Sequence, residues 1–130
     1  MTDGPEHALR AYVTAFATLD ADTILPFYHL PCMFLTPFGT FLVSDVEASR
    51  VLVGMLIDQA RSQGYHHTTI RHLDVRQLTP RLAILTGMFV RFNAAQDEIA
   101  RFGFAYTLLH DGTGWRITVA IAHEADAAAV

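Results

Sequence analysis

The chain has 130 residues, a net charge of −4 at neutral pH and one cysteine. This length is enough for one domain with its own hydrophobic core, so we expect residues 1–130 to form a single domain. The acidic balance argues against nucleic acid or an anionic membrane as the main partner. All nine basic residues are arginines, which excludes Schiff-base chemistry on a lysine.

The composition is more apolar than usual, with 52% hydrophobic and 17% charged residues. This surplus predicts an internal cavity, a dimer interface or both. The polar N-terminus lacks the pattern of a secretory signal, and the single Cys32 cannot form an intrachain disulfide, so we expect a cytoplasmic protein. The uncharged segment 24–43 is long enough to cross a membrane, but three prolines and a glycine interrupt it, so we expect no membrane span.

Helical spacing dominates the first part of the chain. We predict a first helix that begins at Pro5. Its apolar stripe is formed by Leu9, Tyr12, Val13, Phe16 and Leu19. Asp20 or Asp22 can cap a second, short helix, which we expect to run to Tyr28 and to be ended by Pro31.

Two short strands, at 32–36 and 41–43, are predicted before a third helix. Ser44 and Glu47 have the spacing of a capping box, so we expect this helix to begin there. Gly64 is a natural stop for the helix. Its inner side is predicted to carry Val46, Val51, Leu52, Met55 and Leu56.

After residue 64 the period changes from helical to alternating. Four strands are predicted, at 68–78, 82–92, 99–109 and 115–123. The tail from Glu124 to Val130 is small and mostly alanine, so we expect it to fray. Helices followed by antiparallel strands indicate an α+β domain. We expect three helices packed on one face of a strongly curved, mixed, mainly antiparallel sheet, which forms a cone with an internal pocket.

The order of these elements matches a known pattern. It is carried by Arg10-Ala11-Tyr12-Val13, by the helix at 20–28, by Thr36-Pro37-Phe38-Gly39, by the helix from Ser44, and by the turn Asp111-Gly112-Thr113-Gly114. In these residues the chain resembles the nuclear transport factor 2-like (NTF2-like) cone fold, and more narrowly its SnoaL-like and ketosteroid-isomerase-like branch. The resemblance implies the fold and not one function, because this fold hosts many unrelated activities.

Ketosteroid isomerase places an Asp base opposite an oxyanion hole made of a Tyr and a protonated Asp. The resemblance puts the oxyanion-hole tyrosine on Tyr12, the base on Thr36 and the protonated acid on Tyr106. A threonine hydroxyl cannot act as a base near pH 7 without an activating partner, so steroid isomerisation by that mechanism is not expected. The same resemblance implies pocket-lining positions for Tyr28 and His123.

The candidate site is therefore a pocket of hydroxyl groups with one imidazole, which suits acid–base chemistry by His with Tyr as hydrogen-bond donor. The candidate catalytic residues are Tyr12, Tyr106 and His123. The candidate lining residues are Phe16, Tyr28, Thr36, Met55, Phe104 and Val119.

Three functions are compatible with this pocket. The first is an isomerase, dehydratase or cyclase that acts on a small apolar substrate, with His123 moving protons and Tyr12 and Tyr106 stabilising negative charge. The second is a non-catalytic domain that binds a small hydrophobic ligand. The third is a domain whose apolar surplus serves mainly to form a homodimer through the outer face of the sheet.

No cofactor or metal is expected. His66 and His72 would lie about 20 Å apart on an extended strand at ~3.3 Å per residue, too far to share an ion. Cys32 has no activating neighbour in the sequence and is expected to be a buried, inert thiol. Arg91 and Arg101 flank the turn between two predicted strands and are expected to form a solvated hairpin rim.

Overall fold

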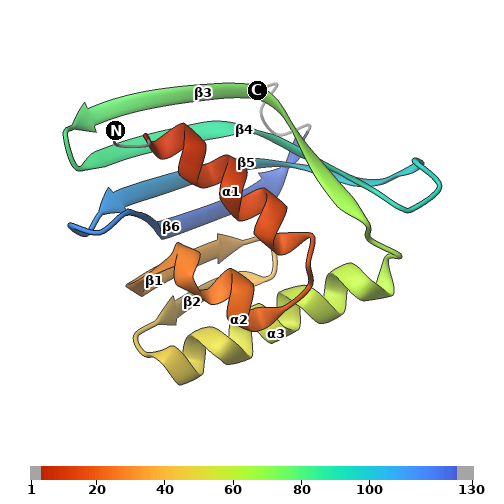
Figure 1. Ribbon diagram of the computed structural model, residues 1–130. Coiled ribbons are helices and arrows are strands. Elements are labelled where there is room, and N and C mark those ends of the chain that lie inside the picture. The colour runs from red at the N-terminus through yellow and green to blue at the C-terminus, as the bar shows by residue number, and fades with distance from the viewer. Residues whose placement is uncertain (1–3, 126–130) are drawn as a thin grey trace.

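A computed structural model describes residues 4–125 of the protein (Figure 1). The elements in chain order are α1 (Pro5–Phe16), α2 (Ala21–Ile24), the 3₁₀ turn η1 (Leu25–Phe27), β1 (Tyr28–Thr36), β2 (Gly39–Val43), α3 (Val46–Ser62), β3 (His67–Thr79), β4 (Leu82–Phe92), β5 (Glu98–His110) and β6 (Trp115–Glu124). This order confirms the predicted α+β class. Within residues 4–125, no helix is long and apolar enough to cross a membrane.

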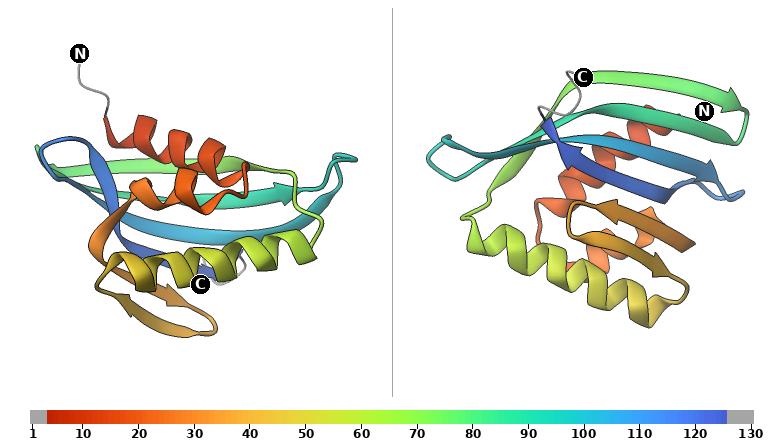
Figure 2. Two further views of the ribbon diagram at one scale, coloured as in Figure 1. Left: turned by 60° about the horizontal axis from the view of Figure 1, so that its bottom comes forward. Right: turned by 180° about the vertical axis from the view of Figure 1, so that it is seen from behind.

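The six strands form one curved sheet in the order β2-β1-β6-β5-β4-β3. Strands β1 and β6 run parallel, and every other neighbouring pair runs antiparallel. The sheet is mixed and mainly antiparallel, as predicted, but β2 and β3 are its edges and it does not close into a barrel. The helices lie on one side of it, as the two views in Figure 2 show. We call this side the inner face; its side chains include Phe34, Leu85, Phe104, Tyr106 and Ala120.

Helix α1 begins at Pro5, as predicted, and buries Leu9, Tyr12 and Phe16 against the sheet. The predicted second helix is shorter than expected, since its α-helical part ends at Ile24 and the 3₁₀ turn ends at Phe27.

Strand β1 starts at Tyr28 and includes Pro31, so the prediction that Pro31 ends a helix is wrong. The pairing of β1 with β6 shifts register between Tyr28 and Met33. A proline, which has no amide hydrogen to donate, is tolerated at such an interruption of the ladder.

Helix α3 differs from the prediction in its cap and in its buried side. Asp45, and not Ser44, caps it, because the Asp45 carboxylate accepts a hydrogen bond of 2.8 Å from the amide of Ala48. The buried residues are Ser49, Leu52, Val53, Ile57 and Ala60. The predicted inner residues Val46, Val51 and Met55 are 59%, 61% and 56% exposed. Apolar residues surround much of this helix, so the sequence pattern allowed more than one apolar stripe.

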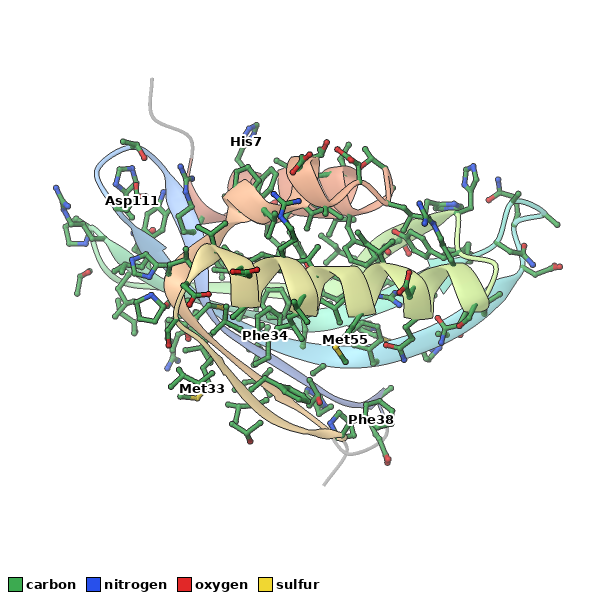
Figure 3. All side chains as sticks on the ribbon, turned by 90° about the horizontal axis from the view of Figure 1, so that it is seen from below. His7, Met33, Phe34, Phe38, Met55 and Asp111 are labelled. Carbon is green, nitrogen blue, oxygen red and sulfur yellow. The ribbon has the colours of Figure 1, made fainter. Side chains whose placement is uncertain are left out.

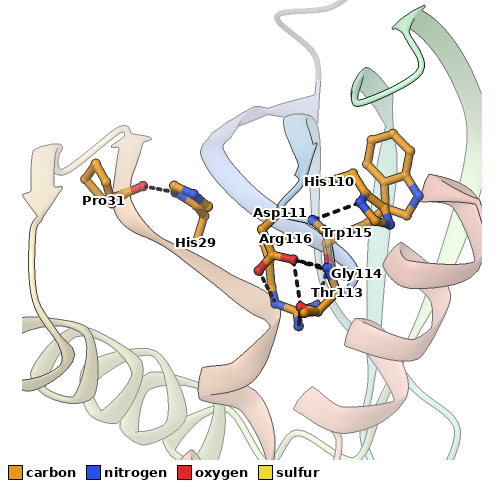
Figure 4. Close-up of polar contacts among 9 residues, drawn as sticks. His29, Pro31, His110, Asp111, Thr113, Gly114, Trp115 and Arg116 are labelled. Carbon is orange, nitrogen blue, oxygen red and sulfur yellow. Dashed lines mark hydrogen bonds and ion pairs between the residues drawn. The ribbon is translucent and has the colours of Figure 1, made fainter.

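The four predicted C-terminal strands are present, with bounds that differ by at most one residue at each end. A network at Asp111 closes the turn between the last two of them (Figure 4). The Asp111 carboxylate accepts hydrogen bonds from the amides of Thr113 and Gly114, at 2.8 and 3.0 Å, and from the Thr113 hydroxyl at 2.7 Å. These bonds lower the pKa of Asp111. The turn fixes the β5–β6 register that places Tyr106 opposite Ala120.

The predicted frayed tail, Glu124 to Val130, is covered only in part. Glu124 ends β6, and residues 126–130 lie outside the described residues.

Candidate functional site

A cavity of about 760 Å³ lies between α3, the β1–β2 hairpin and the inner face of β4, β5 and β6. Figure 3 shows Phe34 and Met55 between the helix and the hairpin, Met33 on the opposite side of β1, and Phe38 at the hairpin tip. Phe38 is 83% exposed, so the hairpin tip marks the solvent side of the cavity. The volume is in the range of small-molecule sites, roughly 300–1,000 Å³.

Three tyrosines, from α1, β1 and β5, form a cluster, and two of them, Tyr12 and Tyr106, border the buried end of this cavity. Tyr12, Tyr28 and Tyr106 are 6%, 6% and 7% exposed. The hydroxyls of Tyr12 and Tyr28 form a hydrogen bond. The ring of Tyr12 lies 5.5 Å from that of Tyr28 and 6.2 Å from that of Tyr106, between centroids.

Burial is the main cause that raises the pKa of each of these tyrosines well above the ordinary value. A desolvated phenol keeps its proton because the charged phenolate loses its hydration. Tyr12 and Tyr106, which border the cavity, are therefore neutral near pH 7 and do not act as bases.

Arg91, on the inner face of β4, lies next to the tyrosines. Its guanidinium carbon is 5.2 Å from the ring of Phe16, 5.3 Å from that of Tyr65 and 5.2 Å from that of Phe102. Each such cation–π contact contributes about 0.5–2 kcal/mol, more when water is excluded. The Arg91 Nε atom is buried without a hydrogen-bond partner, and Arg91 makes no ion pair with any residue of the described range 4–125. The expectation that Arg91 belongs to a solvated rim is wrong.

Five of the nine residues singled out from the sequence border the cavity: Tyr12, Phe16, Thr36, Met55 and Tyr106. Three others do not border it: Tyr28, Phe104 and Val119. The Tyr28 hydroxyl bonds that of Tyr12, and the ring of Phe104 stacks on Phe89 with centroids 4.1 Å apart. Val119 pairs with Met33 and Thr107 and so lies on the outer face of the sheet.

His123, the ninth residue, borders the cavity through the end of β6, but its ring lies elsewhere. His123 pairs with Gly103, whose neighbours Phe102 and Phe104 point to the inner face. The ring crosses Gly103 so closely that a Cβ atom there would lie 2.0 Å from the His123 Cε1 atom. The imidazole therefore lies on the outer face, across the sheet from Tyr12 and Tyr106.

The hydroxyl of Thr36 is used by the hairpin. It donates to the carbonyl of Gly39 at 3.1 Å and accepts from the amide of Phe38 at 3.1 Å. These bonds hold the corner of the β1–β2 turn.

Arg91 is the functional candidate that sequence reasoning missed. Strand alternation in the predicted segment 82–92 puts Arg91 on the same face as Phe89, but it does not show that this face is the inner one. Its neighbour across the turn, Arg101, has the opposite environment. The Arg101 side chain pairs with Glu98, with two N–O distances of 2.6 Å.

Within residues 4–125 there is no cluster of three or more side chains of the types that bind metals. Burial raises the pKa of the Cys32 thiol to about 12. Cys32 is 2% exposed, so this thiol is buried and protonated, as expected.

Comparison with known proteins agrees with this fold. The family described as NTF2-like protein (DUF6841) matches residues 5–125. No curated protein matches the chain. An NTF2-like protein of unknown function from Shewanella oneidensis superposes with a TM-score of 0.71, at 12% identity, over 90% of this chain and 93% of that one.

A protein of unknown function with a cystatin-like fold from Nostoc punctiforme superposes with a TM-score of 0.74, at 8% identity, over 94% of this chain and 93% of that one. An NTF2-like superfamily protein from Salmonella enterica gives a TM-score of 0.64, at 11% identity, over 92% and 87%. Such low identities show the fold alone. The narrower SnoaL-like branch stays a prediction. The match over residues 5–125 shows that the chain belongs to the NTF2-like family DUF6841.

Proposed function

We propose that this protein binds a small, mainly apolar molecule in the cavity between α3, the β1–β2 hairpin and the sheet. The observation that carries the proposal is the cavity of about 760 Å³ in a chain of only 130 residues. It is bordered by apolar and aromatic side chains from every neighbouring element. The hydroxyls of Tyr12 and Tyr106 are at its buried end, where they orient a bound molecule.

Binding is supported better than catalysis by the positions of the titratable groups. An isomerase, dehydratase or cyclase needs a group that exchanges protons with the substrate near neutral pH. The raised pKa values of Tyr12 and Tyr106 disfavour that role, and the imidazole of His123 lies on the outer face. Among the described residues, the one carboxylate that borders the cavity belongs to Glu124, which is exposed at the end of β6.

The apolar surplus also supports a second partner, another copy of this chain. In the described part of the chain the outer face of the sheet is not covered by a helix. Met33 is 37% exposed there, next to the half-buried Val119 and Ile121. We place the homodimer contact on this face.

The binding proposal is tested with the neutral fluorescent probe N-phenyl-1-naphthylamine. We expect saturable binding at micromolar concentration with a rise in fluorescence. Ala122→Phe fills the cavity from the inner face and should weaken binding about tenfold or more. Ala105→Phe is the matched control, since Ala105 lies on the outer face of the neighbouring strand.

Absence of saturable binding by the wild-type protein would contradict the proposal. Equal losses of probe affinity in Ala122→Phe and Ala105→Phe would also contradict it, because they would indicate that the probe binds outside the cavity. Circular dichroism of both variants shows that each is folded.

A further inference from the structure

The most informative unexplained feature of the cavity is the guanidinium of Arg91. It borders the cavity, and within residues 4–125 no carboxylate oxygen lies within 4.0 Å of it. Three aromatic rings, those of Phe16, Tyr65 and Phe102, hold it in place but offer no oxygen to its N–H groups. Its Nε is buried and has no partner. A buried cationic donor without an acceptor is destabilising, and such groups in native proteins often have a functional role.

The space beside Arg91 fits a small polar group. A recess of about 30 Å³ lies between α1 and the sheet and is lined by Arg91, Tyr12, Thr68 and Tyr106, together with apolar side chains. A water-sized group needs roughly 10–15 Å³ of such space, so the recess can hold an oxygen atom of a ligand. Arg91, Tyr12 and Tyr106 also border the large cavity. A ligand can therefore place a polar head at the recess and an apolar body in the cavity.

The charges around the recess favour a head with one negative charge. Arg101 borders the cavity through β5, but its guanidinium is paired with Glu98. Arg91 is thus the cation directed at the buried end. One guanidinium matches one carboxylate with two parallel hydrogen bonds, whereas a phosphate carries up to two charges at pH 7. The hydroxyls of Tyr12 and Tyr106 are neutral and polar, so they border the recess without adding charge.

We propose that the cavity binds a monocarboxylate with an apolar body, whose carboxylate is held by the guanidinium of Arg91 beside the hydroxyls of Tyr12 and Tyr106. This inference rests on the proposed function, since it names the chemical class of the ligand for the same cavity. The apolar body lies between α3 and the β1–β2 hairpin, where Leu52, Leu56 and Phe34 border the cavity.

The test compares acids and alcohols of the same skeleton by isothermal titration calorimetry. The probes are dodecanoate with dodecanol, and 2-naphthoate with 2-naphthalenemethanol. We expect the wild-type protein to bind the acid of at least one pair about tenfold or more tightly than the alcohol. Arg91→Gln should abolish that preference and leave alcohol binding within about threefold of the wild type. Arg101→Gln, the matched control on the other face, should keep the preference.

A second measurement needs no variant. The pKa of dodecanoate labelled with ¹³C at its carboxyl carbon is followed by NMR in the bound and free states. A carboxylate beside an arginine has a lowered pKa, whereas a carboxylate in an apolar site has a raised one. We expect the bound acid to have the lower pKa.

The outcomes separate the two proposals. Alcohols that bind as tightly as the acids, an acid preference that survives Arg91→Gln, or a raised pKa of the bound acid would overturn the carboxylate site while leaving the binding cavity in place. A wild-type protein that binds none of the four probes, nor N-phenyl-1-naphthylamine, would overturn the proposed function itself.

Discussion

Arg91 and Arg101 lie on adjacent strands and on opposite faces of the same sheet. Arg91 faces inward among Phe16, Tyr65 and Phe102 and has no carboxylate partner in the described part of the chain. Arg101 faces outward and pairs with Glu98 at 2.6 Å. The two side chains are chemically identical, so the difference between them is due to the alternation of a β-strand. Arg91 can therefore bind an anionic group of a ligand, whereas the charge of Arg101 is already paired with a carboxylate of the protein.

The same contrast extends to the rest of β5. On the inner face, Phe104 is 1% exposed and stacks on Phe89. On the outer face, Gly103 and Ala105 alternate with it, opposite His123 and Ile121. The inner face is a packed core around a cavity, whereas the outer-face side chains Ala105, Ile121 and His123 are only half-buried. Three predictions test this comparison, from the largest expected effect to the smallest.

The largest effect is expected at Phe104. Phe104→Ala should lower the free energy of unfolding by about 3–5 kcal/mol, because it removes a fully buried ring and leaves a cavity. Ile121→Ala, on the outer face, should lower the free energy of unfolding of the monomer by about 1.5 kcal/mol or less, since Ile121 is only half-buried. Urea unfolding of both variants gives the two values. Equal losses of unfolding free energy in the two variants would contradict the view that only the inner face is a packed core.

The next effect concerns pairing through the outer face. We expect light scattering at micromolar concentration to give twice the mass of one chain. Ile121→Arg should halve that mass, because it places a charge in an apolar contact. Ser62→Arg, on an exposed position of α3, is the control and should remain a dimer. A monomeric wild-type protein would refute the homodimer proposal.

The effect that is smallest at neutral pH concerns the buried tyrosines, because it appears only in alkaline solution. The pKa values of Tyr12, Tyr28 and Tyr106 are raised in the folded state, mainly by burial, above the ordinary 10.0. The unfolded chain therefore loses these protons first as pH rises. Their contribution to stability is complete below about pH 10 and is lost as pH rises above it. Circular dichroism and tyrosinate absorbance should change together in that range. Ionisation of all tyrosines near pH 10 in a folded protein would contradict the buried cluster.

Much of the fold could be predicted from local patterns. The four strands after residue 64 were located to within one residue at each end, because alternation and turn residues are properties of short segments. The start of α1 at Pro5 and its buried Tyr12 and Phe16 followed from helical spacing. Errors occurred where local signals were ambiguous. Asp45 and Ser44 are both good caps, and the apolar residues of α3 allowed more than one stripe.

The candidate site was predicted less completely than the fold. Five of the predicted residues border the cavity: Tyr12, Phe16, Thr36, Met55 and Tyr106. His123 and Val119 were assigned to the pocket, but strand pairing puts the His123 ring and the Val119 side chain on the outer face. Alternation within one strand shows which residues share a face and does not show which face is inner. That choice depends on the neighbouring strand.

The sequence by itself determined the order of helices and strands, the turns between them and the family to which the chain belongs. These properties depend on residues close together in the chain. Only the tertiary structure decided which side of α3 is buried, which face carries His123 and which rings surround Arg91. The guanidinium of Arg91, on β4, meets Phe16 from α1, Tyr65 from the loop after α3, and Phe102 from β5. Contacts among segments so far apart in the chain form only when the sheet and the helices pack together, so no local pattern could reveal the unpaired charge at the end of the cavity.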